Sequence, residues 1–503
     1  MSEQHPVVPI GGTHRRSLPG WIRASSAYAL APLLLGLLTA CTLVPTYRRP
    51  DTPMAQSWDG AARSSLADAV TVRSAWWRNY QDPQLNELVE RSLQNNFSLA
   101  SAVASVNLAR ANAERAGAPL YPTLSAGGTF ARTHQRTNAS GPTSPNSSNN
   151  GQSLFAEASY EIDFWGLNSA NADAARLLAR ASEFDRDTVA LTLTASVTDT
   201  YFQIQSLRQR LSLAHAIESN ARHILDLLLA QQQAGVATQL QVEQQRNALA
   251  TFQAAIPALQ QQLEQSMHLL ATLEGVAPEQ FMLGAAQIDD IPIPQPLPNL
   301  PATLLETRPD IRSKEAQLQS QNYSVGAARA AFLPNLVLTA DGGLSSNTLT
   351  RFLSSPFSSL AATLAAPLLD GGALRGQLHA NQAGFAKATA DYRQTVVSAL
   401  QDVEDSLTAQ QQGALAETAE RAAADAATQA AALAEAQFQG GTIDFLSVLD
   451  AQRTRYQAQD ALAQALLQRL QASVSVFRAF GGGAGMTTDT PTPVAAISSS
   501  ISH

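Results

Sequence analysis

Two long spans without proline constrain the fold of this chain most strongly. No proline lies between Gly166 and Gly235, or between Gly372 and Gly441. The glycines of each pair are equally far apart, since 235 − 166 = 69 and 441 − 372 = 69. A helix of that length rises roughly 100 Å, at 1.5 Å per residue, well beyond the diameter of a globular domain. The two spans therefore predict rods of equal length that fold back at Gly235 and Gly441.

The rods belong to a longer internal duplication. A shift of 206 positions pairs Asp199 with Asp405 without an insertion, whereas upstream a shift of 212 pairs Pro122 with Pro334. The six-residue difference falls where residues 137–152 are all small or polar, which predicts a surface loop there.

Composition and motifs exclude several classes of protein. The net charge is −8 and no run of basic residues occurs, which argues against nucleic-acid binding. The sequence contains no phosphate-binding loop, zinc-protease, paired-cysteine or nucleophile-elbow motif. We therefore expect no enzymatic activity, no cofactor and no metal site. The predicted organisation is a signal peptide (1–40), a lipid-anchored extended segment (41–74), a first repeat (75–277), a Pro-rich linker (278–300), a second repeat (301–480) and a disordered tail (481–503).

The N-terminus has the pattern of an export signal. An apolar run over residues 24–38 follows three basic residues, Arg15, Arg16 and Arg23. The run is too short for a spanning helix. The run ends in the letters LTAC, and Cys41 is the only cysteine of the chain. This motif resembles the lipobox of bacterial lipoproteins, which implies a lipidated Cys41 sorted to the outer membrane. A chance cysteine in a hydrophobic leader is the alternative.

Each repeat also contains two short segments in which apolar and polar residues alternate. The pattern is typical of transmembrane β-strands, although hairpins that pack on the rods and face solvent would show it too. The four predicted strands lie near residues 123–132, 154–164, 335–345 and 358–368. Their polar faces carry four acids, Glu157, Glu161, Asp163 and Asp341.

Four strands cannot close a barrel, and a bilayer tolerates only closed barrels. If the strands span a membrane, several chains must share one barrel, with eight strands from two chains or twelve from three. The sequence does not choose between these. In either barrel, the four acids would line a water-filled lumen.

The rods need partners of their own. The first shows a seam at coiled-coil spacing and the second a seam of smaller residues, which indicates antiparallel coiled coils. The predicted seams are Leu211, Ala214, Ile217, Ala221, Ile224 and Leu228 in the first rod, and Leu415, Ala419, Ala422, Ala426 and Leu433 in the second.

These features together resemble the TolC-like outer membrane efflux proteins, in particular their NodT-type lipoprotein branch. The resemblance covers roughly residues 41–480. It rests on Cys41, Trp76-Trp77, Asp82-Pro83-Gln84-Leu85, Asp163-Phe164-Trp165-Gly166, Arg308-Pro309-Asp310-Ile311, Ala330-Ala331-Phe332-Leu333-Pro334, Leu369-Asp370-Gly371-Gly372 and Val448-Leu449-Asp450-Ala451-Gln452-Arg453.

The resemblance implies an α+β membrane protein that assembles as a homotrimer. Four strands per chain would form a twelve-stranded β-barrel in the outer membrane, continued by a long periplasmic α-helical barrel of coiled-coil hairpins. The implied function is the exit duct of a tripartite efflux system. Its implied partners are a periplasmic adaptor, an inner-membrane pump of the RND type and outer membrane lipid.

The resemblance also places a closed periplasmic aperture near the second turn. Asp450 matches an inner acidic position, and Asp444 either joins it or caps a helix. Phe438, Ile443 and Ser447 depart from the family's polar residues, so Phe438 or Leu446 could form a hydrophobic constriction instead. The turns are the expected adaptor contacts, at Gly235, Val236, Gly440 and Gly441.

Two other functions fit the same sequence. A type I outlet for secreted proteins would have the same fold and differ in its partners. A lipid-anchored periplasmic coiled-coil spacer would have no pore.

Overall fold

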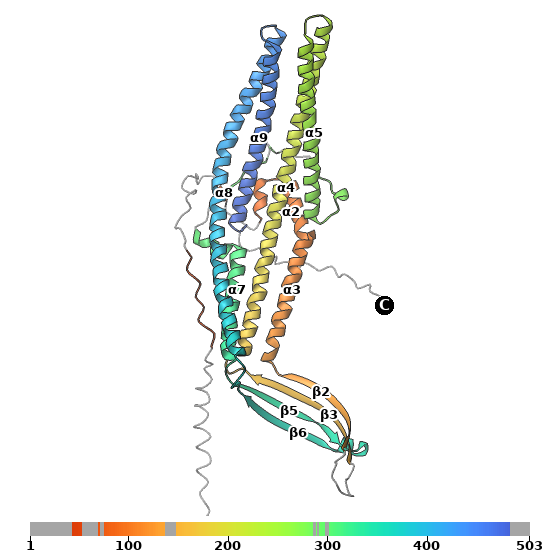
Figure 1. Ribbon diagram of the computed structural model, residues 1–503, viewed down its shortest axis with the longest axis vertical. Helices are drawn as coiled ribbons and strands as arrows, with labels where there is room; N and C mark the ends of the chain where they lie inside the picture. The colour runs from red at the N-terminus through yellow and green to blue at the C-terminus, as the bar shows by residue number, and fades with distance from the viewer. Residues whose placement is uncertain are drawn as a thin grey trace, which may run out of the picture.

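The chain forms a long rod with a small sheet at one end (Figure 1). The computed structural model describes residues 43–52, 69–70, 75–135, 147–284, 288, 291–296 and 301–482. The export signal, Cys41, most of the tail and parts of the linker lie outside the described residues, so what was expected of them stays a prediction.

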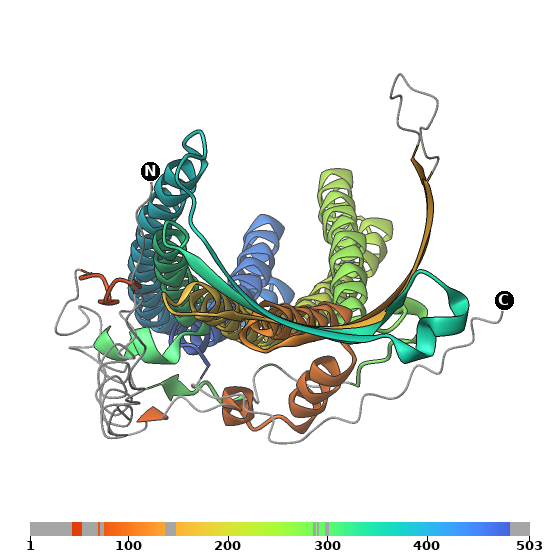
Figure 2. The same cartoon turned by 90° about the horizontal axis from the view of Figure 1, so that it is seen from below.

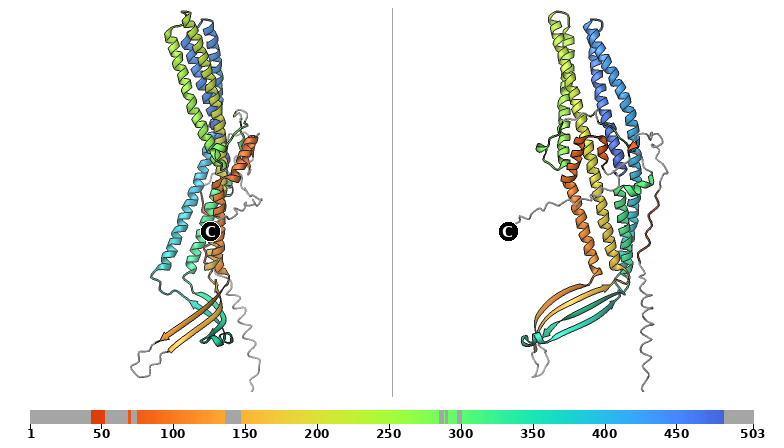
Figure 3. Two further views of the ribbon diagram at one scale, coloured as in Figure 1. Left: turned by 90° about the vertical axis from the view of Figure 1, so that its right-hand side faces the viewer. Right: turned by 180° about the vertical axis from the view of Figure 1, so that it is seen from behind.

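Two helices of 67 residues run most of the length of the rod, α4 (Leu167–Gln233) and α8 (Ala373–Gln439). Each turns back into a shorter helix, α5 (Gln239–Glu274) or α9 (Phe445–Ala479). The starts of α4 and α8 differ by 373 − 167 = 206 positions, and so do those of α5 and α9, since 445 − 239 = 206. Figure 3 shows both hairpins with their turns at the end away from the sheet.

Shorter elements complete the two repeats. The first contributes η3 (Trp76–Tyr80), α2 (Pro83–Asn95), α3 (Phe97–Gly117) and η4 (Ala118–Leu120). The second contributes η7 (Pro301–Thr303), α6 (Leu304–Thr307), α7 (Pro309–Ala330) and η8 (Leu349–Ser354). Between them lie η5 (Pro278–Gln280) and the two-residue strand β4 (Gln295–Pro296), which pairs in parallel with β1 (Ala69–Val70), a two-residue strand ahead of the first repeat.

The sheet contains both repeats. Its strands are β2 (Thr123–Gln135), β3 (Ser147–Ile162), β5 (Asn335–Ser346) and β6 (Pro356–Ala365), in the antiparallel order β2-β3-β5-β6. Viewed along the rod, the sheet is curved (Figure 2). Two sequence-based boundaries were wrong. Residues 147–152 belong to β3 rather than to a loop, because they pair with β2, and β6 ends three residues before Leu368.

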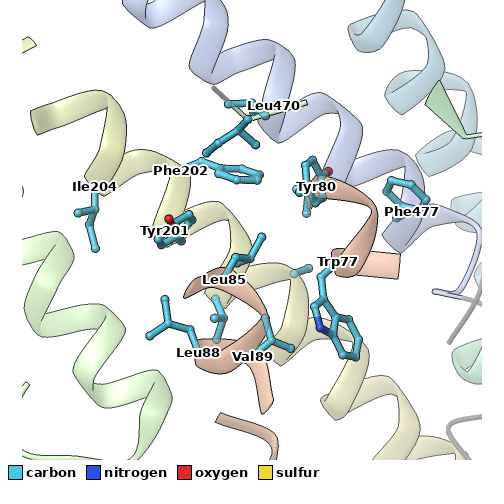
Figure 4. Packing of buried hydrophobic residues seen from close by; sticks show 14 of the residues in the cluster. Trp77, Tyr80, Leu85, Leu88, Val89, Tyr201, Phe202, Ile204, Leu470 and Phe477 are labelled. Atoms are coloured by element: carbon cyan, nitrogen blue, oxygen red, sulfur yellow. The ribbon is translucent and has the colours of Figure 1, made fainter. Parts of the chain in front are cut away.

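The largest hydrophobic core lies at the middle of the rod, where η3, α2, α4 and α9 meet (Figure 4). Trp76 stacks on Phe477 with ring centroids 5.3 Å apart, and the Tyr80 hydroxyl lies 2.6 Å from Ser473 Oγ. Asp82 caps α2 by accepting a hydrogen bond from Gln84 N at 2.9 Å, as predicted from the Asp-Pro pair. This core fixes α2 against both repeats.

The two predicted rod seams had different outcomes. In α4 the prediction is confirmed, because five of its six seam residues are buried and Leu211 is partly buried. In α8 it was wrong, since Leu415 and Leu433 are 61% and 62% exposed. The residues of α8 that are buried along this stretch are Glu417, Ala424, Ala427 and Ala431. The seam with α9 therefore consists of small residues, and the apolar stripe identified from the sequence faces away from it.

Residues 43–52 lie against α7. Pro45 O accepts a hydrogen bond from Asn322 Nδ2 at 2.7 Å, and Arg49 binds both carboxylate oxygens of Glu315 at 2.8 Å. Val44 occupies the space above Gly326, where a β-carbon would come within 2.5 Å of Val44 Cγ2. At the other end of the chain, Gly481 and Gly482 are buried, and a β-carbon added to Gly482 would come within 2.5 Å of Leu191 Cδ1. The first two residues of the predicted tail are therefore part of the core.

Among the helices that the structure describes, none combines the length and the apolar character needed to cross a bilayer.

Candidate functional site: the sheet and the helix tips

The four-stranded sheet has one apolar and one polar face. On the apolar face, large side chains are open to solvent in the single chain, and alternate residues of each strand share that face. These exposed residues are Leu124, Phe130, Leu154, Leu360 and Leu364. A soluble monomer rarely exposes such a continuous apolar surface.

The polar face carries three of the four predicted acids. Glu157 lies opposite Asp341 across the β3–β5 pair, and Asp341 accepts a hydrogen bond from Ser359 Oγ at 2.7 Å. Glu161 lies opposite Val337 on the same face. No lysine, arginine or histidine shares this face in the described strands, because Arg132 and His134 of β2 fall on the apolar one.

Asp163 does not belong with these acids. β3 ends at Ile162, and the Asp163 carboxylate accepts hydrogen bonds from Asn168 N at 3.1 Å and Ser169 N at 2.7 Å. These are amides of the first turn of α4, whose N-terminus favours a negative charge. The interpretation of Asp163 as a strand acid was wrong because period-two alternation continues one residue past the end of the strand.

Both flanks of the molecule have unpaired surfaces. β2 and β6 are the edge strands of the sheet. Among the helices, α3 packs mainly on α4, whereas α8 packs mainly on α7 and α9. Three exposed apolar residues of α3 are Phe97, Val103 and Leu108, and three of α8 are Val397, Leu415 and Leu433. The α8 residues are 18 positions apart, since 415 − 397 = 433 − 415 = 18, which is five helical turns and places them in one line.

The helix tips are built alike in the two repeats. Gly235 has φ 80° and Gly441 has φ 73°, a left-handed conformation that glycine adopts without strain. Val236 N donates to Gln231 O at 2.8 Å, and Thr442 N donates to Gln437 O at 2.9 Å. This bond, donated three residues past the end of the helix, satisfies a carbonyl of the last turn that the helix leaves free.

The residue that follows each tip turn caps the returning helix. Thr238 caps α5 with a reciprocal hydrogen bond involving Gln241, and Asp444 caps α9 by accepting from Ser447 N at 2.8 Å. The bond from the Ser447 amide, followed by that from its hydroxyl, lowers the pKa of Asp444. Of the two roles expected for Asp444, the structure shows the helix cap.

The remaining tip residues divide between packed and exposed positions. Phe438 is half-buried and contacts Phe445, with ring centroids 5.9 Å apart. Leu446 is 59% exposed and Val236 is 75% exposed. Phe438 therefore holds the two helices of its hairpin together, whereas Leu446 and Val236 are free to contact another molecule.

Asp450 is exposed at a groove of about 450 Å³ between α5 and α9. The groove is lined by apolar, amide and charged groups, among them Phe252, Tyr456 and Arg453. Asp450 is thus placed where the two hairpins face each other, five residues after the start of α9.

Polar contacts that sequence analysis missed join the two hairpins. Arg210 of α4 binds Asp460 of α9, with Nε 2.6 Å from Oδ1, and both side chains are mostly buried. Glu435 of α8 accepts from Asn220 of α4 at 3.0 Å and, within its own hairpin, from Gln452 of α9 at 2.8 Å. No local pattern indicated these pairs, because the partners of two of the three contacts are more than 200 residues apart.

One carboxylate oxygen near the main core is buried and has no hydrogen-bond partner among the described residues. Asp199 of α4 lies among packed helices, and its Oδ1 is buried without a hydrogen bond. Burial raises the pKa of Asp199 to about 7, although the nearby Arg478 lowers it. This carboxyl is therefore partly protonated near neutral pH.

Comparison with known proteins identifies the family. The sequence profile described as "Outer membrane efflux protein" matches residues 88–276 and 300–482. The chain belongs to this family. A similar protein is the pyoverdine export outer membrane protein OpmQ of Pseudomonas putida, which is 37% identical over 468 residues, or 92% of this chain and 98% of that protein. Outer membrane protein OprJ of Pseudomonas aeruginosa is 32% identical over 91% of this chain and 96% of its own length.

Solved structures agree with the family. The outer-membrane channel OprN superposes with a TM-score of 0.82 at 28% identity, covering 88% of this chain and 99% of that one. The open-state MtrE channel of Neisseria gonorrhoeae gives a TM-score of 0.79 at 26% identity, covering 90% and 100%. The predicted family, its role as an outer membrane efflux channel and its location in the outer membrane are thereby confirmed.

Proposed function

We propose that three copies of this chain form one duct, which passively conducts small molecules out of the cell from a periplasmic adaptor and an RND-type pump. The observation that carries this proposal is the pair of incomplete flanks. β2 and β6 end the sheet on opposite sides, and α3 and α8 end the helical layer. A head-to-tail contact between such unlike flanks generates a closed ring where the rotation between neighbours closes, and the curved sheet favours such a rotation (Figure 2).

The family resemblance implies three copies, since the sheet alone would also allow a barrel of eight strands from two chains. Three chains supply 3 × 4 = 12 strands, which is within the range of known outer-membrane barrels. The apolar face would then contact lipid, and the polar face with Glu157, Glu161 and Asp341 would line the lumen. The exposed apolar line on α8, from Val397 to Leu433, would be covered by the opposite flank of the next subunit, which α3 forms near the sheet and α5 forms toward the helix tips (Figure 1).

The same assembly sets the sign of the duct's charge. Within the described strands, the polar face has three carboxylates per chain and no basic residue, which gives nine acids in three chains. Rings of acidic side chains favour cations in channels. The duct should therefore conduct cations better than anions.

The helix tips are where the duct would meet its partners. Val236 and the turns at Gly235, Gly440 and Gly441 lie at the end of the rod farthest from the sheet (Figure 1). We place the adaptor contact there, and the periplasmic aperture at Asp450 and Leu446, with Phe438 and Asp444 shaping the turn that carries them. Adaptor binding would open the aperture by separating the hairpins.

Relatives favour small molecules as the cargo. One is named for pyoverdine export and others for antibiotic, toluene or solvent efflux. Protein secretion finds no support in these names. A spacer without a pore does not account for the exposed apolar face of the sheet.

Ion current through planar lipid bilayers tests the proposal. The detergent-purified protein should give steps of current and a reversal potential that indicates cation preference. Glu157→Gln combined with Asp341→Asn should reduce that preference, whereas Glu243→Gln, at an exposed acid of α5, should leave it unchanged. A monomer that gives no current would support the spacer and contradict the duct.

A further inference from the structure

The polar face of the sheet carries two aromatic side chains, and they lie in one row across the strands. Phe155 of β3 pairs with Gly127 of β2 and with Gly343 of β5, and Gly343 pairs with Phe357 of β6. In the described strands, all remaining residues of this face are small, polar or acidic, except Val337. Two large aromatic groups at one level are therefore a distinct feature of an otherwise hydrophilic surface.

The glycine of β2 determines how Phe155 lies. A β-carbon added to Gly127 would come within 2.8 Å of Phe155 Cζ, so the ring lies over Gly127. Aromatic rings are known to cover glycine in this way and to stabilise a sheet. The ring is therefore part of the wall, with its outer side facing the space that the polar face borders.

Phe357 has no such role. It is 37% exposed, and the residue opposite it on β5 is Gly343, which has no side chain to cover it. Leaving an aromatic side chain exposed to water is unfavourable compared with burying it. Sheet packing thus explains the position of Phe155 but not that of Phe357.

We propose that Phe155 and Phe357 form an aromatic row on the wall of the duct, and that this row transiently binds solutes that carry an aromatic ring. The inference rests on the proposed function, which turns the polar face toward the lumen. Three subunits would place 3 × 2 = 6 rings at one level. Glu157 and Asp341 follow two residues closer to the helices, about 7 Å along the strands.

This spacing favours aromatic cations among aromatic solutes. The aromatic ring of such a solute can stack on a phenylalanine ring while its positive charge lies near a carboxylate. Its charged group can also contact the face of the phenylalanine ring directly. A single contact of this kind is weak, which suits a duct, because a conducted solute must bind and leave again. The expected preference for an aromatic over a saturated cation is about threefold.

A pair of matched cations tests the row in planar bilayers. Benzyltrimethylammonium and its saturated counterpart, (cyclohexylmethyl)trimethylammonium, have the same charge and a similar size. The concentration that halves the ion current should be about threefold lower for the aromatic cation. Replacement of both phenylalanines by leucine keeps their bulk and should bring the ratio close to one, whereas tyrosine at both positions should keep it.

Phe130→Ala is the matched control, because this exposed phenylalanine lies on the apolar face of β2 and should not affect the ratio. The double leucine variant keeps an apolar side chain at each site, so it should still assemble where a truncation of both side chains to alanine would not. Wild-type current with no preference for the aromatic cation, or a preference that survives the leucine variant, overturns the row alone. Wild-type protein that gives no current at all overturns the duct and the row together.

Discussion

Helices α4 and α8 have the same length and duplicated positions, yet they have different surroundings. Of 67 residues, 25 are buried in α4 and 10 in α8. The difference arises because α4 packs on α2, α3, α5, α7 and α9, whereas α8 packs mainly on α7 and α9. One copy of the repeat thus became the centre of the chain, and the other kept an open flank, which a neighbouring subunit can cover.

The same contrast appears within the two hairpins. The α4 seam contains Ile217, Ile224 and Leu228, so it is held by buried apolar area. The α8 seam contains Ala424, Ala427 and Ala431, beside Glu417, which forms ion pairs with Arg421 and Arg469. Small residues allow close approach of the helices and bury less area. The second hairpin should therefore separate more readily, as an aperture near its turn requires.

The largest effect is expected from charges on the open flank of α8. Val397→Asp combined with Leu415→Asp puts two charges into the line that we assign to the subunit contact, and burying unpaired charges is costly. We expect the trimer to be lost, as measured by light scattering in detergent. Met282→Asp is the control, since Met282 is 88% exposed and lies outside both flanks. A variant that stays trimeric would show that α8 is not covered.

A second effect contrasts the two seams. Leu228→Ala removes a fully buried leucine from the α4 seam and should cost about 3 kcal/mol of local stability. Ala431→Leu overfills the α8 seam and should cost roughly 1–3 kcal/mol. Hydrogen exchange of peptides from each hairpin should show faster exchange in the second hairpin only for Ala431→Leu, and in both hairpins for Leu228→Ala, because Leu228 packs in one cluster with Val242 of α5 and Phe445 of α9. Equal acceleration in both hairpins by Ala431→Leu would mean that the hairpins open together and that the contrast has no dynamic consequence.

The smallest effect concerns Asp199 and its duplicate Asp405. Asp405 is exposed and accepts a hydrogen bond from Gln401 Nε2 at 3.2 Å, whereas burial raises the pKa of Asp199 to about 7. A raised carboxyl pKa means that the folded state binds a proton that the unfolded state has released. Stability should therefore fall as pH rises from about 4 to about 7, and stay low above that range.

Asp199→Asn should remove this loss, which we expect to be about 2 kcal/mol between pH 5 and pH 8. The midpoint of thermal unfolding, measured across that range, should become less dependent on pH than in the wild type. Asp405→Asn should leave the wild-type dependence unchanged. If both variants behave like the wild type, the Asp199 carboxylate is not desolvated in the assembled protein.

Sequence patterns predicted most of the architecture, because repeated spacing and period-two alternation are local properties. The turns at Gly235 and Gly441, the cap at Asp82 and the α4 seam all followed from such patterns. The α8 seam did not, since an apolar stripe looks the same whether it faces a helix of its own chain or of another. The stripe with Leu415 is exposed in the single chain, so the seam predicted there was wrong.

Site residues were harder to predict for a related reason. Asp163 continues the alternation of β3 but accepts hydrogen bonds from the first turn of α4, and the difference depends on where the strand ends. Arg210 and Asp460 are 250 residues apart, so their contact exists only in the folded chain. The aromatic row of Phe155 and Phe357 became visible through the strand register, which no single strand contains.

A cryo-electron microscopy map of the detergent-purified protein tests the central claim most directly, because it shows what lies on the open flank of α8. We predict three subunits in a ring, with the flank formed by α3 and α5 of one subunit covering Val397 and Leu415 of the next, and with β6 paired with a neighbouring β2. A map in which α8 faces solvent, or packs against its own copy, would contradict this account.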